Sequence, residues 1–95
     1  MIKFKFGGVL WPGLAKLVEE CGEVVQVLGK LVMVDGGRHH WSGDLIEMLE
    51  NELGDLLAAI QFMTQTSPLD SEKIQRRAAQ KLETFYKWHE EGKRS

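Results

Sequence analysis

The sequence has one cysteine, two prolines and no long apolar run, and each shortage narrows what the chain can be. Cys21 cannot form an internal disulfide and has no second thiol with which to bind a metal ion. No apolar stretch approaches the roughly 20 residues that a membrane-spanning helix needs, so we expect no membrane partner. Nothing at the N-terminus has the pattern of a signal peptide. These absences lead us to expect a cytoplasmic protein.

An excess of charge of one sign is also lacking, because 12 basic side chains face 14 acidic ones and the net charge is −2. Such a chain has no global positive field with which to attract nucleic acid through counterion release, so we expect no nucleic-acid partner. A domain of 95 residues buries only about two-thirds of the surface that its unfolded chain exposes. A partner subunit would help to complete its core.

Apolar residues recur at helical spacing in three segments, which predicts an all-α fold and one domain over residues 1–95. The first predicted helix runs from about 12 to 33, because Pro12 suits a first helical turn and Asp35-Gly36-Gly37 stops the pattern. Its apolar positions are Leu14, Leu17, Val18, Cys21, Val24, Val25, Leu28, Leu31 and Val32.

The second helix is predicted from about 44 to 65, where Asp44 and Glu47 form a capping box and the segment before Pro68 leaves the α region. The third covers about 70 to 91, with Asp70 as its N-cap and Gly92 at its end. Its predicted inner face consists of Ile74, Ala78, Leu82, Phe85 and Tyr86.

Two further segments complete this organisation. Residues 2–6 alternate apolar and basic side chains before Gly7-Gly8 interrupts the pattern, so residues 1–10 are expected to form a short extended arm. The stretch from 34 to 43 has turn-forming residues at both ends and is expected to be a loop, in which the role of His39-His40-Trp41 stays open. The predicted architecture is an antiparallel helical bundle whose core is completed by a homodimer or homotetramer.

Two acidic pairs stand out, Glu20 with Glu23 and Glu52 with Asp55, each at i, i+3 spacing. Such pairs lie about 5–6 Å apart on one helix face, where like charges repel. A single pair of this kind is ordinarily a solvated acidic surface. Glu52, however, lies roughly 50° from the centre of the apolar stripe of its helix, and a carboxylate in that place must be paired, protonated or bound to a metal ion.

Packing the first helix against the second brings these four carboxylates together. Lys16 and Lys30 can neutralise only part of that charge, whereas a divalent cation can neutralise more of it. Ligands that are all carboxylate oxygens favour a hard ion, so we expect Mg²⁺, with Mn²⁺ as a possible substitute. A site of this kind is suited to phosphoryl chemistry.

The motifs Glu19-Glu20-Cys21-Gly22-Glu23 and Glu52-Leu53-Gly54-Asp55, with their apolar neighbours, resemble the MazG-like all-α nucleoside triphosphate pyrophosphohydrolases, whose signature is E-E-x-x-E followed by E-x-x-D. The resemblance covers about Leu14 to Tyr86. It implies hydrolysis of a (deoxy)nucleoside triphosphate between the α- and β-phosphates. It also implies that Glu20, Glu23, Glu52 and Asp55 are the metal ligands, while Glu19 is a candidate base, a ligand for a second ion or a solvated side chain.

The family also places a basic residue on the following helix, and Lys81 is its best match, with Arg77 one turn before it. Where the family commonly has an asparagine one turn later, this chain has Phe85. A surface lysine is the ordinary alternative for Lys81, in which case Arg77 or Lys16 is the next candidate for contact with phosphate.

A nucleobase pocket needs an aromatic wall, and the candidates are Trp11, Trp41 and Phe62. Two rival functions stay open at this point. One is a helical interaction module that binds nucleotide or metal without turnover; the other is a phosphoribosyl-ATP pyrophosphohydrolase, as the resemblance also implies. The sequence does not choose the base, the number of metal ions or the pathway.

Overall fold

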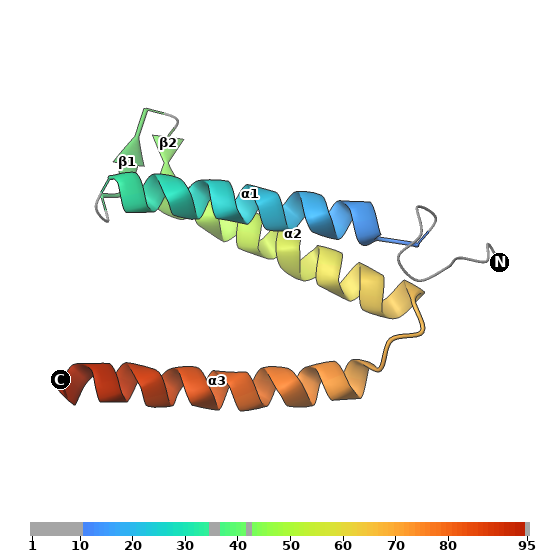
Figure 1. Ribbon diagram of the computed structural model, residues 1–95. Coiled ribbons are helices and arrows are strands. Elements are labelled where there is room, and N and C mark those ends of the chain that lie inside the picture. Colours follow the sequence, from blue (N-terminus) through green and yellow to red (C-terminus); the bar gives the residue numbers. More distant parts are fainter. Residues whose placement is uncertain (1–10, 35–36, 42, 95) are drawn as a thin grey trace.

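The computed structural model describes residues 11–34, 37–41 and 43–94, and it is an all-α structure of three long helices with one short β-hairpin (Figure 1). The helices are α1 (Leu14–Met33), α2 (Leu45–Thr66) and α3 (Ser71–Arg94). The strands β1 (His39–His40) and β2 (Gly43–Asp44) pair antiparallel. The arm predicted for residues 1–10 lies outside the described residues. None of the described helices has the length and apolar character needed to cross a membrane.

Two predicted helix bounds and the predicted loop need correction. α1 begins at Leu14 because Gly13 adopts a left-handed conformation with φ 80°, so Pro12 precedes the helix. The segment expected to be a loop contains the β-hairpin, since His39 and Asp44 pair across it. α3 continues through Gly92 to Arg94, because that glycine does not adopt the left-handed conformation with which a glycine ends a helix.

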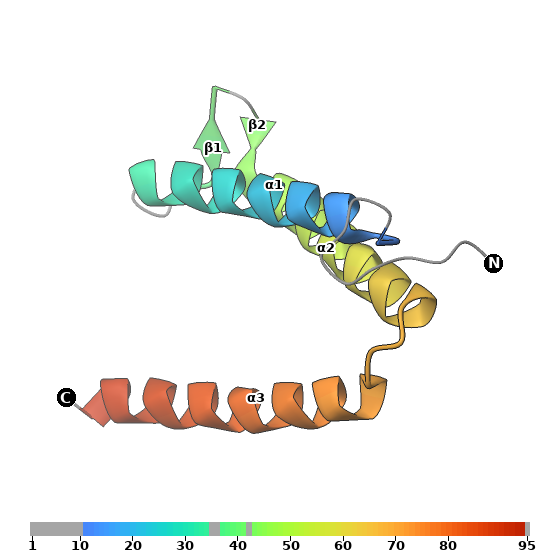
Figure 2. The same ribbon diagram turned by 45° about the vertical axis from the view of Figure 1, so that its right-hand side comes forward.

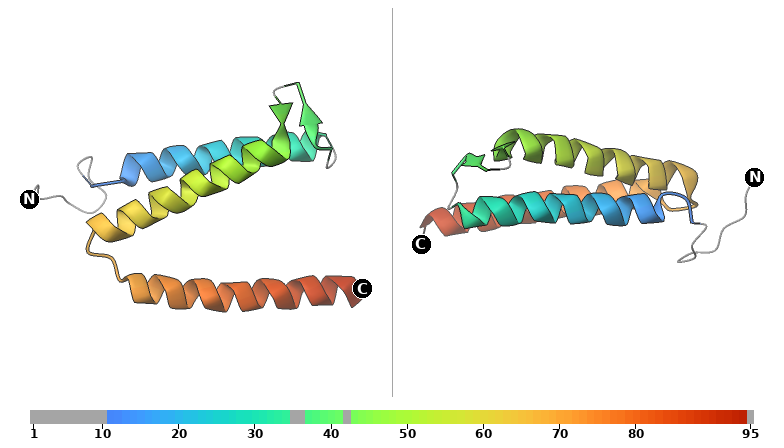
Figure 3. Two further views of the ribbon diagram at one scale, coloured as in Figure 1. Left: turned by 180° about the vertical axis from the view of Figure 1, so that it is seen from behind. Right: turned by 90° about the horizontal axis from the view of Figure 1, so that it is seen from above.

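α1 and α2 pack against each other in antiparallel fashion and form the core (Figures 1 and 3). The facing positions follow a spacing of alternating three and four residues, which keeps one stripe of each helix turned toward the other. Leu45 is fully buried at the start of α2, and Glu20 and Glu52 occupy positions in these same stripes. The other inward-facing residues, all buried or half-buried, are Leu17, Val24, Val27, Leu31, Leu49, Leu56, Ala59 and Met63.

The hairpin lies at one end of the helix pair, where polar contacts join it to the start of α2. Arg38 forms an ion pair with Asp44 at 2.9 Å, and the backbone N–H of Leu45 donates to the carbonyl of Arg38 at 2.8 Å. Asp44 is the N-cap of α2, as predicted, and accepts from the backbone N–H groups of Ile46 and Glu47. Burial acts to raise the pKa of Asp44, but the Arg38 hydrogen bond and these two backbone bonds outweigh it and lower the pKa.

At the opposite end of the helix pair, the residues before α1 contact the end of α2. The indole N–H of Trp11 donates to the hydroxyl of Ser67, the C-cap of α2, at 2.7 Å. A Cβ added to Gly13 would lie 3.0 Å from Cδ1 of Phe62 and 3.4 Å from Cα of Met63. The absence of a side chain at this position therefore allows the backbone of α1 to approach α2 closely.

Gly13→Ala is expected to destabilise the protein by about 1–2 kcal/mol or more, because alanine in a left-handed conformation costs that much and the Phe62 ring must also move. Urea unfolding followed by circular dichroism measures the change. Gly29→Ala is the matched control, since a Cβ there meets nothing within 4 Å inside a helix. The control should be neutral or stabilising; equal destabilisation by both variants would contradict the role given to Gly13.

α3 lies apart from the α1 and α2 pair in this chain (Figures 1 and 2). Its described side chains are exposed, with only Thr84 half-buried, so the inner face predicted for this helix is not covered by its own chain. The radius of gyration is 16.9 Å, whereas a compact domain of this length has about 12 Å. The single chain therefore leaves much of its apolar surface uncovered.

α1 and α2 also have a second, outward-facing apolar stripe each. On α1, Val18 and Val25 are each 66% exposed, although both belong to the apolar positions that predicted this helix. The helix thus has two apolar faces, of which only one packs inside the chain. The exposed apolar side chains of the two helices include Val18, Val25, Leu28, Val32, Leu53, Leu57 and Ile60.

Candidate metal centre

The midpoints of α1 and α2 hold a cluster of four carboxylates, called here the acidic cluster. It consists of Glu20 and Glu23 from α1 and Glu52 and Asp55 from α2. One carboxylate oxygen of each residue lies within 4.8 Å of those of the other three. The i, i+3 spacing within each helix and the antiparallel packing of the two helices together produce this arrangement.

The acidic cluster is closed on one side and open on the other. Glu20 is only 8% exposed, Glu23 and Glu52 are half-buried, and Asp55 is exposed. Within the described part of the chain, one buried carboxylate oxygen of Glu20 and one of Glu52 have no hydrogen-bond partner. Buried polar atoms are ordinarily satisfied, so these two oxygens indicate a place where a ligand completes the structure.

The electrostatics of the acidic cluster agree with this geometry. Burial raises the pKa of Glu20, and the charges of Glu23 and Asp55 raise it further. A side-chain hydrogen bond with Glu23 raises the pKa of Glu52, and burial and the neighbouring carboxylates add to this effect. Both shifts arise because four like charges share a small, partly dehydrated space.

A divalent cation fits the donor set. All four residues offer carboxylate oxygens, two of these oxygens are buried without a partner, and no cysteine or histidine belongs to the cluster. Hard cations such as Mg²⁺ prefer oxygen ligands of this kind and leave positions for water and for substrate phosphates. The exposed side at Asp55 provides such access.

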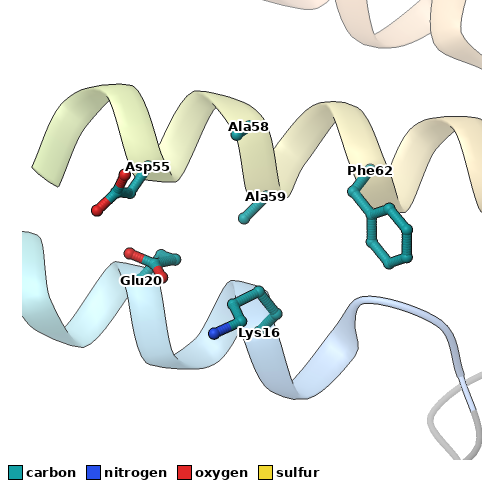
Figure 4. Close-up of a pocket in the computed structure, with 6 residues that line it drawn as sticks. All are labelled: Lys16, Glu20, Asp55, Ala58, Ala59 and Phe62. Carbon is teal, nitrogen blue, oxygen red and sulfur yellow. The ribbon is translucent and has the colours of Figure 1, made fainter. Parts of the chain in front are cut away.

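A hollow of about 370 Å³ adjoins the acidic cluster, a size within the range of small-molecule sites (Figure 4). Glu20 and Asp55 lie at one end with their carboxylates between the helices, and Phe62 lies at the other end on α2 (Figure 4). Lys16 lies across from α2 on α1, one turn before Glu20. Ala58 and Ala59 complete the lining.

Ala58 and Ala59 are lining residues that the sequence analysis missed. They follow Asp55 by three and four positions, which places them on the same part of α2 as this carboxylate. Their small side chains leave the space between Lys16 and Phe62 open. The helical register from Asp55 was the available signal, but small residues in a helix are so common that it did not stand out.

Lys16 and Glu19 form an ion pair on the surface of α1, with 3.3 Å between Nζ and the carboxylate. The hydrogen bond with Glu19 raises the pKa of Lys16, so this side chain stays positively charged beside the hollow. Glu19 is not part of the acidic cluster and its side chain is 54% exposed. Its contact with Lys16 is consistent with the solvated alternative considered for it.

Other candidates from the sequence do not meet the acidic cluster within this chain. Lys81 and Arg77 are exposed on α3, which lies apart from α1 and α2. Trp11 does not line the hollow, because its indole is hydrogen-bonded to Ser67. Trp41 is 90% exposed on the hairpin, where Lys30 Nζ lies 6.0 Å from its ring. Of the three aromatic candidates, Phe62 alone lines the hollow.

The metal-free protein is expected to gain stability as the pH falls from 7 toward 4.5. The pKa values of Glu20 and Glu52 are raised above the ordinary 4.5 in the folded chain, so the folded state binds protons more tightly than the unfolded state. The resulting stabilisation is complete at a pH below the pKa of these two carboxyl groups in the unfolded chain. It is lost as the pH rises through their pKa in the folded chain. The lowered pKa of Asp44 affects the stability of the fold only below about pH 3.8, which is outside the range from pH 7 to 4.5.

Urea unfolding in the presence of a chelator, at pH values from 7 to 4.5, measures this dependence. Added Mg²⁺ should raise stability most at pH 7 and least near pH 4.5, because protons compete with the cation for the same oxygens. Glu50→Gln on the exposed side of α2 is a control that should leave the slope unchanged. A metal-free protein that loses stability steadily from pH 7 to 5 would contradict the crowding of the carboxylates.

An all-α chain that gathers four carboxylates between two antiparallel helices, beside a hollow of this size, has the architecture of a helical domain that can hold a divalent cation and a small anionic ligand. The chain belongs to the MazG nucleotide pyrophosphohydrolase domain family, whose model matches residues 13–89. Members of this family are hydrolases that act on phosphoanhydride bonds. Comparison with curated proteins and with solved structures gave no significant match.

Proposed function

We propose that this protein hydrolyses a (deoxy)nucleoside triphosphate between its α- and β-phosphates and releases the monophosphate and pyrophosphate. The observation that carries the proposal is the acidic cluster, with two buried and unpartnered carboxylate oxygens, at one end of a hollow. In this proposal Glu20, Glu23, Glu52 and Asp55 hold Mg²⁺, for which Mn²⁺ can substitute. The membership of the family supports the reaction class.

When bound, Mg²⁺ would supply neutralisation of the phosphate charge and would lower the pKa of a coordinated water. The protein's own groups have separate roles. Asp55 and Glu20 line the hollow, so the cation that their carboxylates would hold lies within reach of a triphosphate bound there. Lys16 remains charged and has a flexible stem, so it can exchange Glu19 for a phosphate oxygen. Phe62, half exposed at the far end, offers a ring face to the nucleoside.

The proposal includes a homodimer or homotetramer as the working form. The extended shape of the single chain, the uncovered face of α3 and the outward stripes of α1 and α2 support it. Exposed apolar areas of this extent are typical of interaction surfaces. Light scattering at micromolar concentration measures the assembly, and a stable 10.8 kDa monomer would contradict this part of the proposal.

A panel of nucleotides with Mg²⁺ and detection of pyrophosphate tests the function. The panel contains the ribo- and deoxynucleoside triphosphates and phosphoribosyl-ATP, so it also ranks the base and separates the two enzymatic alternatives. In ¹⁸O-labelled water, attack at the α-phosphorus puts the label in the monophosphate. Release of inorganic phosphate instead of pyrophosphate, or nucleotide binding without turnover, would exclude the proposed reaction and favour a different hydrolase or a non-catalytic binding module.

A further inference from the structure

Six residues at seven-residue spacing follow the face of the helix pair that carries the acidic cluster. They are Lys16, Glu23 and Lys30 on α1 and Met48, Asp55 and Phe62 on α2. Seven residues make nearly two turns of an α-helix, so the three members on each helix share one side of it and lie about 10 Å apart along its axis. This set of six residues is called here the heptad face.

Two pairs of the heptad face are joined across the helix pair. Lys16 and Phe62 line the hollow together, and Glu23 and Asp55 both belong to the acidic cluster. Because α1 and α2 run antiparallel, a third pair follows beyond the acidic cluster, in the direction away from the hollow (Figures 1 and 3). The members of this third pair are Lys30 and Met48.

The β-hairpin lies beside this third pair. A Cβ added to Gly43 of β2 would lie 3.9 Å from the sulfur of Met48. Trp41 lies beside Lys30, with 6.0 Å between the ammonium nitrogen and the centre of the ring, a separation at which a cation is attracted to an aromatic ring. The hairpin projects from the helix pair on the side away from α3 (Figures 1 and 2). It therefore bounds the heptad face at the end opposite to Phe62.

Lys30 is also more enclosed than the other lysines. It is half-buried, whereas the other lysines whose side chains the structure describes are exposed. Side chains on a helix lean toward its N-terminus, which for Lys30 is the direction of Glu23 and the acidic cluster. The acidic cluster thus has a lysine on each side of it along α1, with Lys16 beside the hollow and Lys30 beside the hairpin.

The heptad face gives a bound nucleotide a direction. In the proposed function the nucleoside lies toward Phe62, and the bond to be cleaved lies at the acidic cluster. The β- and γ-phosphates then extend past the acidic cluster, and Lys30 is the next basic residue of α1 in that direction. The ammonium of a lysine on its flexible stem is well suited to bind a phosphate.

We propose that Lys30 binds the terminal phosphate of the nucleoside triphosphate, and that Trp41 is a positioning residue that holds the Lys30 ammonium at this end of the heptad face. Lys30 is then a specificity-determining residue, because the corresponding diphosphate has no phosphate that reaches it. The inference rests on the proposed function, since it takes the direction of the substrate from the positions of Phe62 and the acidic cluster.

The binding of two analogues that cannot be cleaved between the α- and β-phosphates tests the role of Lys30. They are the α,β-methylene forms of a nucleoside triphosphate and of its diphosphate, each titrated by calorimetry in the presence of Mg²⁺. Lys30→Ala should weaken binding of the triphosphate analogue about ten- to a hundredfold, because a charge-assisted contact is lost. Its affinity for the diphosphate analogue should stay near that of the parent. Lys87→Ala, which removes the same charge from the exposed surface of α3, should bind both analogues as the parent does.

Equal losses on both analogues, or no loss on either, would overturn the role of Lys30. The proposed function is judged separately, by release of pyrophosphate from nucleoside triphosphates. A parent protein that releases none, but whose preference for the triphosphate analogue depends on Lys30, contradicts the function and supports the contact with the terminal phosphate. A parent protein that binds neither analogue contradicts both.

Two variants of Trp41 test its positioning role in the same titrations. Trp41→Leu should lower the preference for the triphosphate analogue about two- to fivefold, because the ammonium loses its aromatic neighbour, whereas Trp41→Phe should retain most of the preference. The side chain is 90% exposed, so a folding defect is a poor explanation for either result. If the indole instead stacks on the nucleobase, Trp41→Leu should weaken both analogues equally and by an amount that changes with the base. That result would overturn the positioning role of Trp41.

Discussion

Asp55→Asn is expected to lower kcat about a hundredfold or more on the best nucleotide substrate. Asp55 is the exposed member of the acidic cluster and lines the hollow, so in the proposed function it lies where phosphates and cation would meet. Asparagine keeps the shape but removes the negative charge, which weakens cation binding and the stabilisation of charge that develops during phosphoryl transfer. Its exposure makes a folding defect a poor explanation for lost activity.

Steady-state kinetics at several Mg²⁺ concentrations measure this effect. More Mg²⁺ should restore little activity, because the defect lies in the position of the charge as well as in its affinity. Glu50→Gln removes an exposed carboxylate from the same helix outside the cluster and should retain parental kcat. If Asp55→Asn remains fully active, the assignment of the acidic cluster to catalysis is wrong.

Lys81→Ala is expected to lower kcat/KM about ten- to a hundredfold, because a charge-assisted contact of about 1.5–3 kcal/mol is lost. The dependence on Mg²⁺ should stay near that of the parent, since the four carboxylates are intact. The two variants therefore differ in kind: one changes the response to the cation and the other changes the handling of phosphate.

Lys87→Ala is the matched control for Lys81, because it removes another exposed lysine of the same helix. It should show parental kinetics. If Lys81→Ala also has parental kinetics, another basic residue must contact the phosphates. Lys16, which lies beside the hollow, is then the first residue to substitute.

Much of the fold was predictable because the helical pattern is strong and its ends are marked by capping residues. Asp44 caps α2 and Asp70 accepts from the backbone N–H of Lys73 at the start of α3, as predicted. The start of α1 was not predicted, because no local pattern in the sequence shows that Gly13 adopts a left-handed φ next to Phe62, a residue distant in sequence. The short β-hairpin was missed because two pairs of residues are too few to show an alternating pattern.

The four carboxylates of the candidate site could be predicted from the sequence, whereas the residues around them could be predicted only in part. Spacing alone placed each carboxylate pair on one face, and the apolar stripe showed that Glu52 points toward the other helix. Helical periodicity could not show which of the two apolar faces of α1 packs inside the chain, so it did not separate the exposed Val18 and Val25 from the buried Val24 and Val27. It also could not show that Lys16 is held by Glu19 or that α3 stays apart from the other two helices.

The polar contacts at the two ends of the α1 and α2 pair have a thermodynamic consequence for the binding of the proposed ion. Trp11 contacts Ser67 at one end and Arg38 contacts Asp44 at the other, and these contacts oppose a separation of α1 and α2 that would relieve the repulsion between the carboxylates. The proposed ion would therefore enter a site whose helices are already packed, and its binding would bury little additional apolar surface. Titration calorimetry at several temperatures should accordingly find a heat-capacity change of binding close to zero, in contrast to domains that fold around their metal.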